Sequence, residues 1–214
     1  PLFARLGAYD RGHLDALAFG RSGRRSPERR VTERRFTEYW AHEAALIPIE
    51  DWPLWGWRMR ALRERDHARD DAWSRANGPM LDWLRASLAG SGPVRASTIE
   101  HESAGRTGPW WGWSDVKIGL ERLFRWGEVA IDGRERFERR YGLVEHVLPE
   151  HARADPLPRA EAIRELVARS AAAIGVGTLA DLADVHRLRT DDTRAAVREL
   201  EDAGVLVPVA VEGW

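Results

Sequence analysis

The chain has 214 residues, a formal net charge of −1, 32 arginines against one lysine, 11 tryptophans, no cysteine and no glutamine. The absence of cysteine excludes a disulfide framework, a thiol nucleophile and Cys-ligated zinc, which fits a cytoplasmic protein. No apolar run approaches the roughly 18 to 20 residues that a membrane span needs, so we expect several small folded modules and no membrane association.

The first 52 residues have the pattern of the C-terminal part of a winged-helix module. Residues 10–20 carry apolar side chains at helical spacing and end on a glycine. Residues 20–35 contain seven arginines against two acidic residues, and their glycine, serine and proline favour a loop. Residues 34–49 then supply two wing strands. Such a basic loop can lie on DNA phosphates, and the alternative is a solvated loop.

Residues 53–78 predict a helix of roughly five turns that links the first module to the second. Trp55, Met59 and Leu62 lie at helical spacing, and the alternating charges that follow are typical of a solvated face.

A helix, a glycine and an apolar β-type run occur in this order twice, in a second module (residues 79–149) and a third (residues 150–214). This order is the second half of a winged helix-turn-helix, so we expect a fold that is mainly α with small β wings, an α+β class made of tandem winged helix-turn-helix modules. The aligned positions are Leu120 with Val197, Leu123 with Leu200, Gly127 with Gly204, and Val129 with Leu206.

In the second module, Pro79 begins a helix that ends at the glycines 90 and 92, and residues 95–103 predict a second short helix. Ser114 caps the third helix, which is the presumed recognition helix. A strand at residues 129–131, a turn at Asp132-Gly133 and a returning basic strand then predict a hairpin wing.

In the third module, residues 158–173 predict the first helix, Thr178 with Asp181 caps a short second helix, and Thr190 caps the third. A strand is expected after Gly204. Residues 150–214 contain eight arginines against 12 acidic residues. Because this charge suits DNA poorly, the third module is expected to serve as a scaffold.

Four strings along the chain form a set that occurs together in one family. They are EYWAHEAALIP (Glu38–Pro48), WPLWGWRMR (Trp52–Arg60), PWWGWSDVKIGLERLFRWGEV (Pro109–Val129) and RFERRYGLVEHVLP (Arg136–Pro149). In this order they resemble the winged-helix DNA glycosylases of the AlkZ and YcaQ type. The resemblance implies tandem winged helices around a concave surface that faces DNA, and hydrolysis of the N-glycosidic bond of alkylated purines or unhooking of interstrand crosslinks. The implied partner is double-stranded DNA, alkylated or crosslinked, bound by a monomer without a cofactor.

The same resemblance implies a catalytic Gln-x-Gln or Gln-x-Asp motif just N-terminal to a stretch like PLFARLGAYD. The sequence contains no glutamine, so no residue takes this role by correspondence and the catalytic residues stay unknown. We therefore expect a fragment whose first module lacks two helices, whose motif lies upstream of Pro1, and which is inactive alone.

His42 and Glu43 are candidates for lining the active site, with Glu43 polarising His42 or a water molecule. The alternative is a surface pair on a wing strand. No histidine completes an HExxH zinc motif after this pair, and the other histidines lack ligand spacing, so no metal site is expected.

The candidate DNA contacts are basic residues of the loop at residues 20–35, of the loop that precedes the recognition helix, of that helix and of the wing, together with one tryptophan. The tryptophan can stack on bases or pack in the core, and the lysine can bind phosphate or simply give its helix a polar face. The predicted residues are Arg24, Arg25, Arg34, Arg35, Arg106, Trp113, Lys117, Arg139 and Arg140.

Two other classes of protein fit the same pattern. A winged-helix transcriptional regulator would be a dimer that reads base edges. A protein-interaction module would bind no DNA, or would bind it without weakening in added salt.

Overall fold

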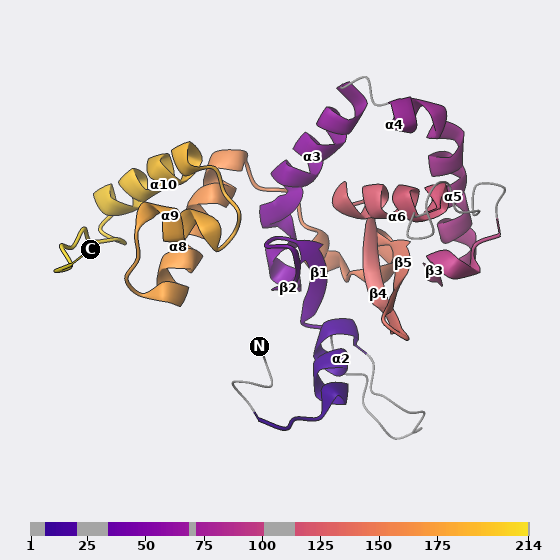
Figure 1. The fold of residues 1–214 in the computed structure, drawn as a ribbon, viewed down its shortest axis with the longest axis horizontal. Helices are drawn as coiled ribbons and strands as arrows, with labels where there is room; N and C mark the ends of the chain where they lie inside the picture. Colours follow the sequence, from indigo (N-terminus) through magenta and orange to yellow (C-terminus); the bar gives the residue numbers. More distant parts are fainter. Residues whose placement is uncertain (1–6, 21–33, 69–71, 101–113, 214) are drawn as a thin grey trace.

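The computed structural model describes residues 7–20, 34–68, 72–100 and 114–213 (Figure 1). It is mainly helical with two small antiparallel sheets, which confirms the expected α+β class. The helices are α2 (Arg11–Phe19), α3 (Trp52–Ala68), α4 (Ala72–Ala76), α5 (Gly78–Ser91), α6 (Asp115–Arg125), α7 (Val144–Val147), α8 (Arg159–Ile174), α9 (Leu179–Asp184) and α10 (Thr190–Asp202). The strands are β1 (Phe36–Trp40), β2 (Ala44–Pro48), β3 (Val94–Arg95), β4 (Val129–Glu135) and β5 (Glu138–Leu143).

The first predicted helix is confirmed as α2. Asp10 caps it by accepting a hydrogen bond from the backbone N–H of Gly12 at 2.8 Å, and Gly20 ends it with a left-handed φ of 64°. The two predicted wing strands are β1 and β2, which pair from Phe36 with Pro48 to Trp40 with Ala44.

The helix α3 covers the first part of the predicted linking helix, residues 53–78; it buries Trp52, Trp55 and Met59 and ends at Ala68, and the separate helix α4 lies in the remainder. The helix predicted to begin near Pro79 is α5, which has this proline in its first turn and Gly92 after its last. Together, α3, α4 and α5 arch around α6 (Figure 1).

The short helix predicted at residues 95–103 is wrong in its described part. Val94 and Arg95 form β3, and residues 96–98 form a single 3₁₀ turn. β3 pairs with β5, in the sheet order β3-β5-β4, because the outer edge of β5 offers backbone groups that need partners.

The turn predicted at Asp132-Gly133 is also wrong. The strand β4 continues through it with a register shift between Ile131 and Gly133, a β-bulge, and the turn lies at residues 136–137. Arg34 donates to the backbone oxygens of Ile131 at 3.1 Å and of Asp132 at 3.0 Å, so a distant side chain satisfies the carbonyls of the bulge.

The three helices α8, α9 and α10 pack together as the C-terminal unit. The capping box at Thr178 is confirmed, but Thr190 is the first helical residue of α10 and the cap position belongs to Arg189, which makes no side-chain capping bond. The strand expected after Gly204 is wrong. Residues 205–211 have no strand pairing among the residues described, and a strand needs a neighbour for its backbone hydrogen bonds.

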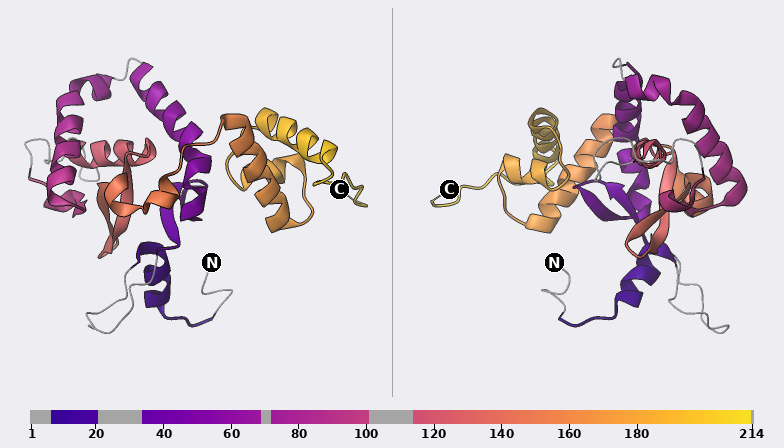
Figure 2. Two further views of the ribbon diagram at one scale, coloured as in Figure 1. Left: turned by 180° about the vertical axis from the view of Figure 1, so that it is seen from behind. Right: turned by 45° about the vertical axis from the view of Figure 1, so that its right-hand side comes forward.

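One large hydrophobic cluster joins β1, α3, α5, α6, the β4–β5 pair and the first half of α8. A second, small cluster of Ile163, Val167, Ala196 and Leu200 lies inside the C-terminal unit, which stands to one side of the rest (Figure 2). The module boundaries at residues 52, 78 and 149 stay a prediction. Within the described ranges, no helix is both long and apolar enough to cross a bilayer.

Candidate DNA-binding site

Four of the predicted DNA contacts lie outside the residues that the structure describes: Arg24, Arg25, Arg106 and Trp113. The other predicted residues occupy three places. These are the β1–β2 turn, an ionic cluster between β1, α6 and the β4–β5 hairpin, and the surface around the bulge of β4.

His42 and Glu43 form the turn between β1 and β2. His42 is half-buried, and its Nδ1 lies 3.3 Å from the backbone oxygen of Val185 at the end of α9. Glu43 is exposed and has a left-handed φ of 53°, which is uncommon for a residue other than glycine. The turn therefore faces the C-terminal unit with its histidine and presents its carboxylate to solvent.

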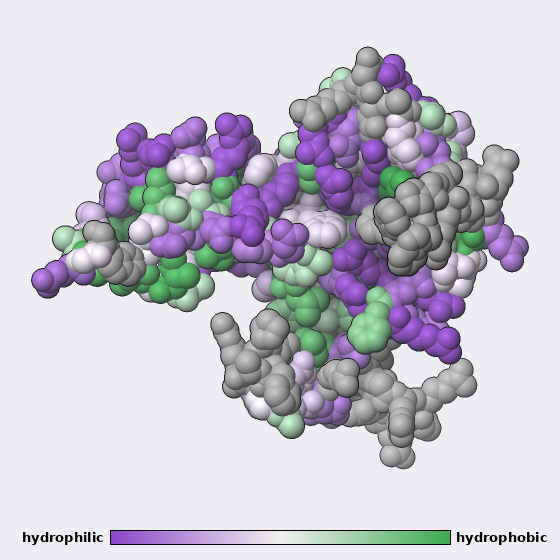
Figure 3. Space-filling model, viewed as in Figure 1, coloured by the Kyte–Doolittle hydropathy of each residue, from purple (hydrophilic) through white to green (hydrophobic). Residues whose placement is uncertain are grey.

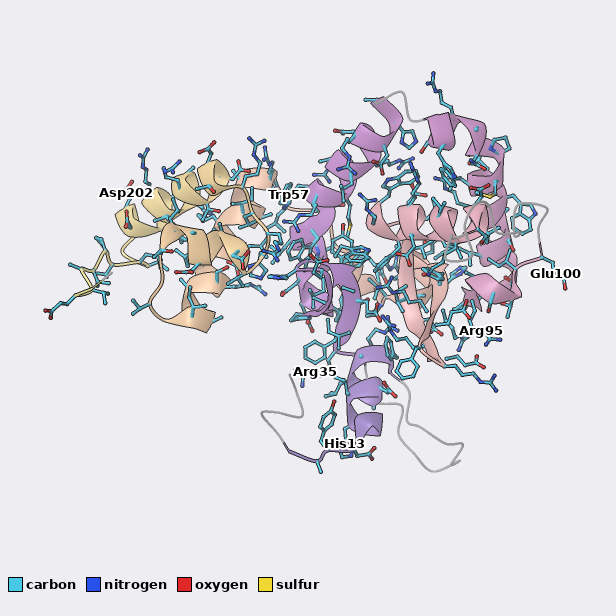
Figure 4. The ribbon with its side chains drawn as sticks, in the orientation of Figure 1. His13, Arg35, Trp57, Arg95, Glu100 and Asp202 are labelled. Atoms are coloured by element: carbon cyan, nitrogen blue, oxygen red, sulfur yellow. The ribbon has the colours of Figure 1, made fainter. Side chains whose placement is uncertain are left out.

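Arg58 holds this turn against the C-terminal unit. Its Nη1 donates to the backbone oxygen of Ala41 at 3.1 Å, and its Nη2 donates to that of His186 at 2.8 Å. The guanidinium lies over the rings of Trp55 at 4.6 Å and Trp57 at 5.3 Å, and Figure 4 shows Trp57 where α3 meets the C-terminal unit. The role of Arg58 could not be predicted from its position on α3, because the groups it binds are 17 and 128 residues away in the chain.

His186 lies beside this arginine. Burial, followed by the charges of Arg58 and Arg169, lowers its pKa from 6.5 to about 4. Its Nδ1 lies 2.9 Å from Ser170 Oγ. The imidazole is therefore neutral at pH 7 and serves packing and hydrogen bonding at this junction.

The ionic cluster consists of Glu38, Lys117, Glu121, Arg134, Arg139 and Tyr141. Arg139 bridges its two carboxylates, donating to Glu38 Oε2 and to Glu121 Oε1, each at 2.8 Å. Glu121 Oε1 also accepts from Lys117 Nζ at 2.8 Å and from Tyr141 OH at 2.6 Å. Two residues predicted to bind phosphate, Lys117 and Arg139, thus have carboxylate partners inside the protein.

The surroundings of Glu121 and Tyr141 shift the pKa of each side chain. Burial alone would raise the pKa of Glu121, but hydrogen bonds from Lys117 and Tyr141 outweigh it, and the pKa lies below its usual value. Burial and the charge of Glu121 raise the pKa of Tyr141, so its hydroxyl stays protonated. The cluster therefore has charged Glu121 at neutral pH. The sequence offered one signal for it, an acidic residue among the apolar positions of a helix.

The third place includes Arg34, Arg35 and Arg140. Arg34 is buried on the β4 bulge, whereas Arg35 is exposed where α2 meets β1 (Figure 4). Arg140 is half-buried and lies 3.4 Å from Asp132 Oδ2, with a hydrogen bond of 3.3 Å to the backbone oxygen of Pro93. Of these three, Arg35 presents its guanidinium most openly to a ligand.

The C-terminal unit neutralises much of its acidic charge internally. Asp192 accepts from Arg159 at 2.6 Å, Asp191 accepts from Arg194 at 2.8 Å, and Asp184 pairs with Arg187. Hydrophilic residues cover the side of this unit that carries α10 (Figure 3). Among the described residues, no group of three or more histidine and acidic side chains could hold a metal ion.

A family model described as DNA glycosylase AlkZ-like matches residues 1–214. The chain belongs to the AlkZ-like DNA glycosylase family. No solved structure matched the chain. Membership of the AlkZ-like family confirms the resemblance read from the four strings, and it identifies DNA as the substrate class of the family.

Proposed function

We propose that this chain holds duplex DNA for an N-glycosylase that excises alkylated purines or unhooks interstrand crosslinks, acting as a monomer through tandem winged-helix modules. The match of the AlkZ-like family over residues 1–214 carries the proposal. Helix α6 followed directly by the β4–β5 hairpin supports the winged-helix part. Because the 214 residues contain no glutamine, we place the Gln-x-Gln or Gln-x-Asp motif outside them.

The chemistry explains what such a protein must supply. Alkylation at N3 or N7 makes a purine cationic, so the base is already a good leaving group. The bond between C1′ and the base nitrogen breaks as water attacks C1′ through an oxocarbenium-like sugar, the water loses a proton, and the base leaves neutral. We further propose that Glu43, with His42 beside it, lines this site and places a carboxylate near the developing positive charge.

A salt titration tests the DNA-binding part of the proposal. Binding of the chain to a methylated duplex should weaken as salt is raised, because arginines displace counterions from phosphates. Arg35→Gln should weaken binding and lower the salt slope by about 1, which is the effect expected for one lost phosphate contact. Arg164→Gln is the matched control, because Arg164 is a half-exposed arginine on the C-terminal unit.

Two results would overturn this part of the proposal. Binding that is absent or insensitive to salt would favour a protein-interaction module. Dimeric binding to one undamaged sequence would favour a transcriptional regulator.

Base release tests the catalytic part. The 214-residue chain should bind methylated duplex without releasing 7-methylguanine, and a longer protein that carries the glutamine motif should release it. Replacing that glutamine by alanine should abolish release, and Glu43→Gln should slow release while leaving DNA binding unchanged. Release by the 214-residue chain itself would contradict the placement of the motif.

A further inference from the structure

The tip of the β4–β5 hairpin has an unusual backbone. Arg136 and Phe137 connect the paired residues Glu135 and Glu138, and both connecting residues have a left-handed φ, of 48° and 69°. Two-residue turns of this kind normally use asparagine and glycine, because a side chain is unfavourable at positive φ. Arg136 and Phe137 therefore stabilise this turn less well than asparagine and glycine would.

Phe137 is also unusually exposed. Its relative exposure is 86%, above that of every other large hydrophobic residue that the structure describes. The hairpin end projects away from α5 and α6 in each view of the ribbon (Figures 1 and 2). A phenyl ring in water adds no burial to the folded state, and backbone strain that a fold retains often lies at a functional site.

Hydrogen bonds connect the backbone of the tip to the ionic cluster. Arg134 donates through Nη1 to the backbone oxygen of Phe137 at 3.0 Å, and through Nε and Nη2 to the two oxygens of Glu38 at 2.6 and 3.0 Å. Glu38 is only 4% exposed and also binds Arg139. The ionic cluster thus fixes the backbone of Phe137 relative to β1, so the backbone of the tip needs little ordering on binding.

The charges around the tip suit a polyanion. Glu138 accepts hydrogen bonds from Ser97 N and Oγ at 2.9 and 2.6 Å, and Glu135 lies 3.4 Å from Arg95. Both acidic residues that flank the turn therefore have partners on the side of β3. Arg136, between them, is exposed at the tip itself.

We propose that Phe137 is a wedge that enters the base stack of duplex DNA while Arg136 lies on the adjoining phosphates. Apolar side chains inserted between base steps unstack and kink the duplex, and a glycosylase must take its target base out of the stack. Phe137 is a positioning residue, since it acts on the DNA helix and touches no reacting atom. The inference rests on the proposed function and adds the element that opens the duplex.

The test uses a duplex with 2-aminopurine beside a methylated purine, because 2-aminopurine fluoresces more strongly when it is unstacked. Binding of the chain should raise the fluorescence. Phe137→Gly should remove this rise and weaken binding by about five- to tenfold, the loss expected for one aromatic contact with a base. Phe137→Trp should keep the rise, and Val207→Ala, an exposed apolar residue of the C-terminal tail, should change neither quantity.

The glycine variant separates function from folding. Glycine suits the φ of 69° at this position, so Phe137→Gly should melt at the same temperature as the unaltered chain or higher, while it loses the fluorescence rise. A full rise with Phe137→Gly, or an equal loss with Val207→Ala, would overturn the wedge and leave the proposed function standing. Failure of the unaltered chain to bind DNA would overturn both.

Discussion

Glu121→Gln isolates the contribution of the ionic cluster to stability. Glu121 is 6% exposed and accepts hydrogen bonds from Lys117, Arg139 and Tyr141 through one oxygen. Glutamine keeps the size of the side chain and one accepting oxygen but removes the negative charge. Arg139 and Lys117 would then lie in the protein with one carboxylate fewer between them.

The size of the effect follows from burial. Breaking a buried ion pair by removing one partner costs about 3–5 kcal/mol. Arg139 keeps Glu38 as a partner, and the side chain of Lys117 is 22% exposed. We therefore expect the lower end, about 3 kcal/mol of unfolding free energy. For a chain of this length, that loss lowers Tm by roughly 6–12 °C.

Thermal unfolding followed by circular dichroism measures this difference. The control is Glu199→Gln, which removes an exposed carboxylate 3.7 Å from Arg164 and should cost less than about 1 kcal/mol. Because the pKa of Glu121 is lowered in the folded chain, its stabilisation is present above pH 4.5 and should be lost as pH falls further. Equal melting temperatures for the two variants at pH 7 would refute the reasoning.

Three further predictions concern single positions. Because the pKa of His186 is lowered from 6.5 to about 4, the unfolded chain binds a proton that the folded chain does not bind between these values. The unfolding free energy from urea titration should therefore fall as pH drops through this window, and His186→Leu should flatten the profile; an unchanged slope would contradict the assignment. Thr178→Ala removes the cap of α9 and should lower the unfolding free energy by about 1 kcal/mol. Thr190→Ala is the control, because it removes no capping bond. Equal losses of Tm in the two variants would count against the observed caps. Gly127→Ala should lower Tm more than Gly175→Ala. Both glycines have a φ of 75°, but only at Gly127 would an added Cβ collide with a side chain of α3. Similar Tm values for the two variants would argue against close packing of Gly127 on α3.

The sequence predicted the features that depend on neighbouring residues. The caps at Ser114 and Thr178, and the glycines that end the helices, were predicted correctly because each motif acts within one turn of backbone. The prediction of a turn at residues 132–133 was wrong. The carbonyls of Ile131 and Asp132 accept hydrogen bonds from Arg34, which is 97 and 98 residues away in the chain.

The candidate site was harder to predict for the same reason. A basic residue on a helix or a wing has the same pattern whether it faces phosphate or an internal carboxylate, and only the tertiary structure shows that Arg139 lies between Glu38 and Glu121. The exposure of Phe137 could not be predicted either. It depends on the strand β4 continuing through residues 132–133, so that the turn lies at residues 136–137.

Helix α8 belongs to both hydrophobic clusters, through Leu166 on one side and Ile163 with Val167 on the other. A chain that ends at residue 158 would therefore lose part of its larger hydrophobic cluster, because the retained part would expose the surface that Leu166 covers. For the same reason, backbone amides of α10 are expected to exchange with deuterium through a local opening, whereas those of α8 should exchange only when the larger cluster opens as well. Through α8, the C-terminal unit shares part of the larger hydrophobic cluster, whereas α10 does not.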